Sequence, residues 1–244
     1  MDGNRGQESN AAPDGALASV MRQARFSGRS DAAGLLAQSA LEQIPESPGQ
    51  SILDLGCGVG DLALALKELR PESDVVGIDF SPANIDAARE RSQAVRFELG
   101  DYLEWQGGPF SAVVADSVLH LFEAPVEQIA RKLAADLQPG GVLVATVPDD
   151  APRNHLLLLM RRLYRMLPPA ADTLAVRLAS LLHPSLSREV LADRIVYMRM
   201  LPRLFGTAEQ AAFAAAGLQL TSDPSWPSPS LAKLRHRLMV WRRT

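Results

Sequence analysis

The sequence predicts an α/β fold in which a seven-stranded, mostly parallel sheet carries helices on both faces. Five short, almost entirely apolar segments alternate with segments of helical periodicity between residues 51 and 147. Strands that are buried on both faces of a parallel sheet have this continuous apolar character. Two more apolar segments close the chain. With 244 residues and 47% hydrophobic composition, the chain is long enough for one such core with an elaboration.

The predicted elements follow one another in a regular order. The five parallel strands are expected at residues 51–55, 74–79, 95–99, 110–116 and 142–147. A helix is expected at 61–69, and Ser81 caps a second helix that has Pro82 in its first turn. Pro125 opens a third helix, which Pro139-Gly140-Gly141 should terminate. After a helical block, a helix at 208–216 and strands at 218–223 and 236–243 complete the sheet.

These elements predict five regions along the chain. Residues 1–15 are polar and rich in Gly, Asn and Asp, which predicts a disordered tail. Residues 16–46 are expected to form an N-terminal helical cap, and residues 47–149 the ligand-binding core. Residues 150–206 contain several helical patterns separated by prolines, and we expect a helical lid there. Residues 207–244 return to the core as a closing helix and two strands.

Composition excludes several functional classes. The net charge of −3 and the pI of about 5.8 show no basic excess of the kind that a broad nucleic-acid surface needs. Cys57 is the single cysteine, so no disulfide can form within the chain, which fits a reducing compartment. The start of the chain lacks the apolar core of a signal peptide, and no apolar run is long enough to span a bilayer. We therefore expect a cytoplasmic protein; the four scattered histidines indicate no metal site.

The most informative segment is the glycine-rich turn after the first strand. It reads ILDLGCGVGDLALAL and contains Gly56, Gly58 and Gly60 between a strand and a helix. Glycines let the chain turn tightly and let a ligand approach the backbone, and α/β folds bind ligands at this edge of the sheet. Asp79 ends the next strand, about 20 residues further on, where a carboxylate can accept hydrogen bonds from both ribose hydroxyls.

The acidic residues around this turn discriminate between cofactors. The dinucleotide pattern requires glycine at the sixth position of G-x-G-x-x-G, and here that residue is Asp61. Asp54 precedes the glycines, where it would repel a pyrophosphate but attract a cationic α-amino group. The turn therefore favours a nucleoside cofactor without phosphates, such as S-adenosylmethionine (SAM), over NAD.

Five stretches, LDLGCGVG, VVGIDFS, ELGDYLEW, VVADSVLHLF and LQPGGVLVATVP, occur in an order and spacing that resemble class I SAM-dependent methyltransferases with a Rossmann-like fold. The resemblance implies that the first stretch encloses the methionine part of SAM, that Asp79 holds the ribose, and that Phe80 lies against the adenine. It implies that Asp101 receives the adenine amino group with Tyr102 beside it, and that Asp116 and Ser117 border the methionine end. The residues implied in the glycine turn are Asp54, Gly56, Cys57, Gly58 and Gly60. Ser111 replaces an aspartate that is common in the family at a structural position.

The sequence offers one candidate base. Methyl transfer from a sulfonium is an in-line displacement in which the protein mainly positions the reactants and excludes water, and a base is needed only if the nucleophile must lose a proton. His120 follows the fourth strand at the carboxyl edge of the sheet, so it is a candidate base or substrate contact. The alternative is that His120 packs and orients this loop.

The lid segment is expected to set the acceptor. It is rich in Leu and Met, as in HLLLLMRRLYRML, which suits an adaptable apolar wall over a small hydrophobic molecule. Two alternatives are that these residues bury the lid's own core, or that the arginines beside them bring the lid to a membrane surface. Two other functions stay open: a protein of this fold that binds SAM without methyl transfer, and a nucleotide-dependent oxidoreductase. The acceptor, the methylated atom and the oligomeric state are not predicted.

Overall fold

The seven strands form one mixed sheet in the order β3-β2-β1-β4-β5-β7-β6. The structure is a computed structural model that describes residues 30–184, 187–188, 191–192, 195, 198–224, 226 and 234–244. The strands are β1 (Ser51–Leu55), β2 (Asp74–Asp79), β3 (Arg96–Leu99), β4 (Phe110–Asp116), β5 (Leu137–Pro148), β6 (Leu218–Ser222) and β7 (His236–Arg243). Strands β1 to β5 are parallel, whereas β7 is antiparallel to both of its neighbours. The predicted fold class is confirmed.

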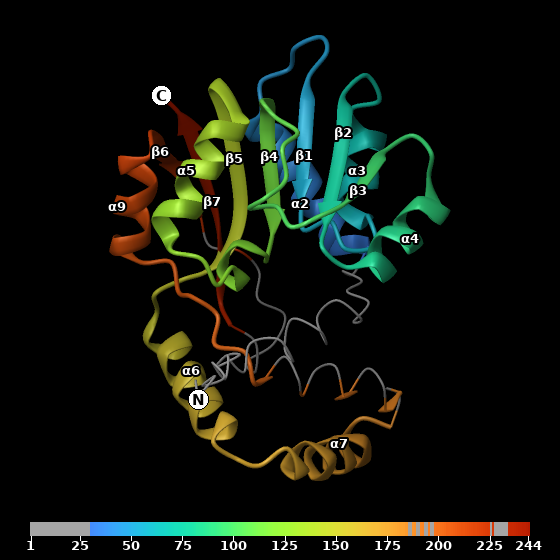
Figure 1. Ribbon diagram of the computed structural model, residues 1–244, viewed down its shortest axis with the longest axis vertical. Helices are drawn as coiled ribbons and strands as arrows, with labels where there is room; N and C mark the ends of the chain where they lie inside the picture. The colour runs from blue at the N-terminus through green and yellow to red at the C-terminus, as the bar shows by residue number, and fades with distance from the viewer. Residues whose placement is uncertain are drawn as a thin grey trace, which may run out of the picture.

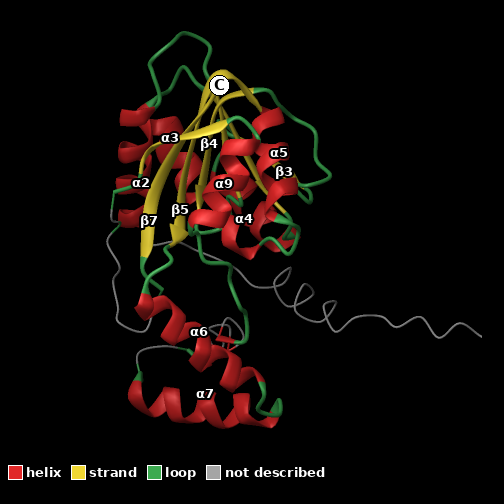
Figure 2. Cartoon of the chain, turned by 90° about the vertical axis from the view of Figure 1, so that its left-hand side faces the viewer, coloured by secondary structure: helices red, strands yellow, loops and turns green. Residues whose placement is uncertain are grey.

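Helices cover the sheet on both faces, as Figure 2 shows with the sheet between them. The helices on one face are α2 (Ser30–Gln43), α3 (Asp61–Leu69) and α4 (Pro82–Arg91), and those on the other are α5 (Val126–Asp136) and α9 (Thr207–Ala215). Each face buries its own apolar cluster. Phe213 of α9 packs on Trp241 of β7, with ring centroids 4.9 Å apart, while Leu36 of α2 and Leu66 of α3 belong to the opposite cluster. The sheet is therefore buried between two helical layers, and the loops that follow its strands lie at its edge.

The parallel arrangement brings several loops to one edge. Leu55 of β1 lies beside Ile78 of β2, and Asp54 lies beside Val114 of β4. The chain runs outward from β1 through β2 to β3 and then returns to β4 on the other side of β1. The carboxyl ends of these strands therefore meet at the point where the strand order reverses, which is where open α/β sheets bind ligands.

Two helices lie apart from the layers. Helices α6 (Pro152–Arg165) and α7 (Ala170–Leu182) follow β5 and extend beyond the carboxyl edge of the parallel strands (Figure 1). A short 3-10 helix, η1 (Leu119–Leu121), follows β4 at the same edge. Within the described part of the chain, no helix combines the length and the apolar character needed to cross a bilayer.

The expected elements and the observed ones differ at the start of β5. Pro139-Gly140-Gly141 follows helix α5 as predicted, but these residues lie within a 12-residue strand instead of preceding it. Gly140 has φ of +75°, and the register between β4 and β5 shifts after the pair Phe110 and Leu137, so the strand begins with an irregular stretch. The predicted tail 1–15 and residues 16–29 of the predicted cap at 16–46 lie outside the described residues. The division into five regions stays a prediction.

Candidate functional site

The glycine turn between β1 and α3 has a backbone conformation that residues with a side chain rarely adopt. Gly56, Gly58 and Gly60 have φ of +72°, +54° and +87°, in the left-handed region that L-residues other than glycine avoid. A Cβ on Gly56 would lie 2.6 Å from Cγ2 of Val118, and one on Gly60 would lie 2.8 Å from Cζ of Phe97. Both conformation and space therefore require glycine, and the turn is as tight as the sequence predicts.

Hydrogen bonds from the turn to the end of β2 fix its position. The backbone N–H groups of Gly56 and Cys57 both donate to the carbonyl oxygen of Ile78 at 2.9 Å. The Cys57 side chain is buried, and burial together with the nearby Asp54 raises the pKa of its thiol. A thiol with a raised pKa is a poor nucleophile, so Cys57 acts as a small packing residue.

Asp79 connects three segments through its buried carboxylate. Its Oδ2 accepts the backbone N–H of Gly58 at 2.9 Å, and its Oδ1 accepts the N–H of Ser81 at 2.8 Å and the side-chain amide of Asn84 at 3.2 Å. A carboxylate offers about four lone-pair sites, so three bonds leave room for about one more. The expected ribose contact can thus use one hydroxyl without disturbing the loop, whereas two hydroxyls would have to replace a protein donor.

Asp54 is buried with an unsatisfied carboxylate oxygen. It is 1% exposed, and no group of the described residues forms a hydrogen bond to its Oδ2. Burial and then the charge of Asp116 raise the pKa of Asp54 well above its usual value, with smaller contributions from Asp79 and Asp61. An unpaired buried acceptor is costly. A cationic group placed against this carboxyl would satisfy the oxygen and lower the pKa.

The end of β4 contributes a strained residue that is held by its neighbour. Ser117 has φ of +55° although it is not glycine, which costs roughly 1 kcal/mol or more. Its backbone N–H donates to Oγ1 of Thr146 on β5 at 2.8 Å, and the Thr146 hydroxyl donates to Asp116 at 2.5 Å. Strain of this kind concentrates at functional sites, so the turn after β4 belongs to the candidate site.

The remaining residues implied for the adenine side differ in exposure. Phe80 is 39% exposed, so its ring is available to a ligand. Asp101 is exposed, and its side chain accepts the N–H of Leu103 at 2.9 Å. Tyr102 is buried in the apolar cluster under α5, where burial and the charge of Asp136 raise the pKa of its hydroxyl. The structure thus brings Phe80 to the surface but turns the Tyr102 ring into the core.

His120 lies on η1 and is 2% exposed. Among the described residues neither ring nitrogen has a hydrogen-bond partner. Its ring lies edge-on to His236, with centroids 5.5 Å apart. Burial, then His236 and Arg161 of α6, lower the pKa of His120 well below its usual value, so the imidazole is neutral at pH 7.

The histidine and tyrosine side chains of the helical segment are separate from His120 and its neighbours. His155 is exposed and lies 2.6 Å from Oδ1 of Asp150, and His183 is exposed at the end of α7. The Tyr164 hydroxyl donates to Asp172 at 2.5 Å; partial burial and this bond raise its pKa to about 12. Tyr197 lies outside the described residues.

Sequence reasoning missed several residues of this edge. Asn84 and Thr146 fix the carboxylates of Asp79 and Asp116, and Gly77 leaves the space that the Cys57 sulfur and the Phe97 ring occupy. Thr146 had a readable signal, because it is the polar residue within the apolar run of β5. Arg161 had none, since it is one of several arginines in a helical segment.

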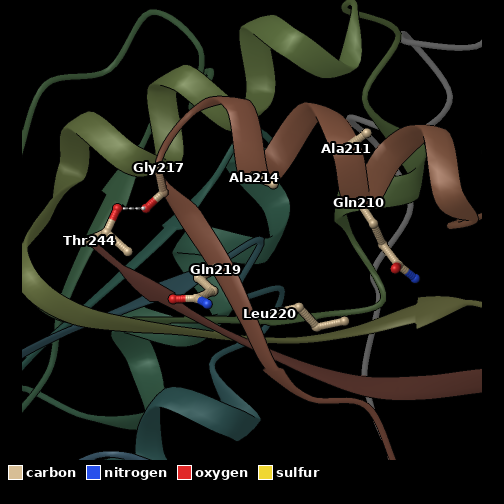
Figure 3. Close-up of a pocket in the computed structure, with 7 residues that line it drawn as sticks. All are labelled: Gln210, Ala211, Ala214, Gly217, Gln219, Leu220 and Thr244. Carbon is tan, nitrogen blue, oxygen red and sulfur yellow. Dashed lines mark hydrogen bonds between the residues drawn. The ribbon is translucent and has the colours of Figure 1, made fainter.

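A separate hollow of about 520 Å³ lies between α9 and β6 (Figure 3). Its lining includes Gln210, Gln219 and Thr244, and the Thr244 hydroxyl donates to the carbonyl oxygen of Gly217 at 3.2 Å. None of the side chains lining it is ionisable, and none belongs to the edge described above. We therefore assign no chemistry to this hollow.

Known proteins resemble the chain in sequence over about half to two thirds of its length and in fold over most of it. A family model described as a methyltransferase domain matches residues 46–174, more than half of the chain. A trans-aconitate 2-methyltransferase of Sinorhizobium fredii is 32% identical over 65% of this chain and 62% of its own length. One from Variovorax paradoxus is 36% identical over 50% of this chain and 48% of its own. A demethylmenaquinone methyltransferase of Thermus thermophilus is 37% identical over 53% and 60%.

Solved structures share the fold. A TehB-like SAM-dependent methyltransferase from Corynebacterium glutamicum superposes with a TM-score of 0.52 and 17% identity, covering 96% of this chain and all of the other. The fold described above is that of class I SAM-dependent methyltransferases. The chain belongs to the methyltransferase domain family, and the predicted resemblance is confirmed. The chain spans about half to three fifths of the length of the curated relatives it matches.

Proposed function

We propose that the protein binds SAM at the carboxyl edge of β1, β2 and β4 and transfers its methyl group to a small molecule. The observation that carries the proposal is the buried Asp54 carboxyl, whose unpaired Oδ2 lies beside a turn that only glycines can form. The carboxylates of Asp54 and Asp79 fit SAM, because the cofactor has a cationic α-amino group and a ribose but no phosphate. SAM supplies an activated methyl group on a sulfonium. The residues of the chain would bind the cofactor, orient it towards the acceptor and exclude water.

Five of the predicted binding residues have an environment that is consistent with their predicted role. Asp54 would accept the α-ammonium group, and the free lone pair of Asp79 would accept one ribose hydroxyl. Phe80, half-exposed beside Asp79, would cover one face of the adenine. Asp116 and Ser117, held by Thr146, would border the methionine end. In this arrangement Tyr102 supports the loop from the core, and we propose no contact between its ring and the cofactor.

We infer the chemical class of the acceptor from the side chains that are buried near the carboxyl edge of the sheet. The Leu and Met residues of the helical segment predict a hydrophobic acceptor, but four of the six on α6 are exposed and the other two are only half-buried, whereas Arg161 is 3% exposed. His120 is buried near Arg161. Nη1 of Arg203 is buried and has no hydrogen bond among the described residues. This inward cationic group favours a small acceptor with an acidic group, and the trans-aconitate enzymes are relatives whose names state such a substrate. Neutral His120 would contact the acceptor or take its proton.

Two measurements test the proposal. Calorimetry with SAM and S-adenosylhomocysteine should show binding, and NADH should show none. Release of S-adenosylhomocysteine should then be measured with trans-aconitate, with other small di- and tricarboxylates, and with apolar phenols as the comparison. Binding without turnover on any acceptor would support the alternative of a SAM-binding protein that does not transfer methyl. Binding of NADH in place of SAM would refute the proposed site.

A further inference from the structure

Helix α6 has its apolar side facing outward. Its exposed residues Leu156, Leu159, Met160 and Leu163 are spaced as one stripe along a helix, and each is more than half exposed. The residues that α6 buries include the polar Asn154 and Arg161. A helix that covered a protein core would show the reverse pattern, so the outer stripe of α6 is not explained by packing on the sheet.

Helix α7 continues this surface. Leu174, Leu178, Leu181 and Leu182 are also exposed at helical spacing, Leu181 and Leu182 by more than three quarters. Met166 and Leu167, between the two helices, are 81% and 47% exposed. We call the segment from Pro152 to Leu182 the arm; both views show it outside the layered core (Figures 1 and 2).

Polar bonds anchor the arm at its start. The side-chain amide of Asn154 donates to the carbonyl oxygen of Asp149 at 2.8 Å and accepts the backbone N–H of Arg235 at 2.8 Å. Asp149 in turn pairs with the Arg235 guanidinium at 2.5 Å. Because these bonds connect α6 to the residue after β5 and to the segment before β7, the outer leucines are not needed to attach the arm.

The charge of the arm is opposite to that of the whole chain. Between residues 152 and 182 there are five arginines and one acidic residue, a formal charge of +4 in a chain whose total is −3. The acidic residue, Asp172, is already paired with Arg199 at 2.8 Å. Arg162, Arg165 and Arg177 are exposed among the leucines, where long side chains can extend their charges past an apolar surface.

The exposed leucines and the positive charge of the arm together indicate which partner would cover this surface. A second copy of the arm would bring the same positive charge against it, which disfavours a self-association through this face. The segment at 16–29 of the same chain carries Arg22, Arg25 and Arg29 and no acidic residue, so charge does not favour it either. Exposed leucines flanked by arginines match the interface of an anionic lipid bilayer, where apolar side chains enter the acyl boundary and cations meet the headgroups.

We propose that the arm is a membrane-docking element that binds the surface of bilayers rich in anionic phospholipid. Docking would bring the carboxyl edge of the sheet close to the lipid surface. The inference concerns the arm alone, so it does not depend on methyl transfer.

The test is co-sedimentation of the full chain with vesicles. We expect binding to phosphatidylcholine–phosphatidylglycerol vesicles, weaker binding at high salt, and little binding to pure phosphatidylcholine. Arg162→Gln with Arg165→Gln should weaken the partition about fivefold for each arginine. Leu159→Asn with Leu163→Asn should weaken it about tenfold for each leucine.

Matched controls lie elsewhere on the surface. Leu35→Asn on α2 removes a leucine of similar exposure, and Arg131→Gln on α5 removes an exposed arginine; both should leave the partition unchanged. Absence of binding to anionic vesicles would overturn the proposal. So would a concentration-dependent dimer that the leucine variant abolishes, or a loss of thermal stability in that variant, because these results would assign the face to a second copy or to internal packing.

Discussion

Removal of the Asp79 carboxylate should damage both the loop and the cofactor site. Asp79 accepts three hydrogen bonds, from Gly58, Ser81 and Asn84. A hydrogen bond to a charged group contributes about 1.5–3 kcal/mol, and a buried donor left without an acceptor costs a similar amount. With allowance for relaxation and entering water, we expect Asp79→Ala to lower the free energy of unfolding by on the order of 4 kcal/mol.

The asparagine variant separates the effect of Asp79 on stability from its effect on cofactor binding. Asp79→Asn keeps one oxygen, which can still accept the bonds from Ser81 and Asn84, but its amide would face the N–H of Gly58. We therefore expect a loss of about 2 kcal/mol. In the wild-type chain, one lone pair of the carboxylate is free to accept a ribose hydroxyl, and the asparagine amide removes it. The affinity for S-adenosylhomocysteine should therefore fall about 10- to 100-fold in this folded variant.

The assays are urea denaturation and titration calorimetry on the same preparations. Asp74→Ala is the matched control, since Asp74 is an exposed aspartate at the opposite end of the same strand, and it should change stability by less than about 0.5 kcal/mol. If Asp79→Ala unfolded at the wild-type urea concentration and bound S-adenosylhomocysteine as tightly, the reasoning about this carboxylate would be refuted.

Three further predictions concern the turn, Asp54 and His120. Gly60→Ala should lower the free energy of unfolding by about 2 kcal/mol or more in urea denaturation, because it combines a φ of +87° with a clash on Phe97. Folding raises the pKa of Asp54, so the native chain holds a proton that the unfolded chain releases. Its stability should therefore fall as pH rises above the ordinary carboxyl pKa of about 3.9, and SAM affinity should rise with pH over the same range. Folding lowers the pKa of His120, so stability should fall as pH drops below about 6.5.

Each of these has a control. Gly34→Ala places a methyl in open space within α2 and should stabilise the chain by about 0.5–1 kcal/mol; equal losses at Gly34 and Gly60 would contradict the steric argument. Asp54→Asn should remove the proton release that calorimetry detects when SAM binds in buffers of different ionisation enthalpy. His120→Gln should flatten the acid side of the stability profile, and an unchanged profile would show that His120 is not buried as a neutral group.

Local sequence was sufficient for the sheet and for the turn. The apolar runs of β1, β2 and β4 reflect burial on both faces of the sheet. A strand that is buried on both faces consists of consecutive apolar residues, so it can be recognised from local sequence. Gly56, Gly58 and Gly60 could be read as a tight turn because left-handed backbone conformations select glycine directly. Asp54 and Asp79 could be placed at one edge because parallel strands end on the same side of a sheet.

Contacts between distant segments decided the rest. Whether the leucines of α6 face inward depends on how Asn154 and Asp149 attach the helix to the sheet, and periodicity alone gives an apolar stripe without saying where it points. Three other features also depend on residues that are remote in sequence. They are the burial of Tyr102 in the core, the hydrogen bond from Ser117 to Thr146, and the proximity of His120 to Arg161. The sequence by itself determined which residues prefer burial or a tight turn, because these are properties of each residue and its neighbours. Only the tertiary structure decided which side chains meet, because long-range packing sets their direction.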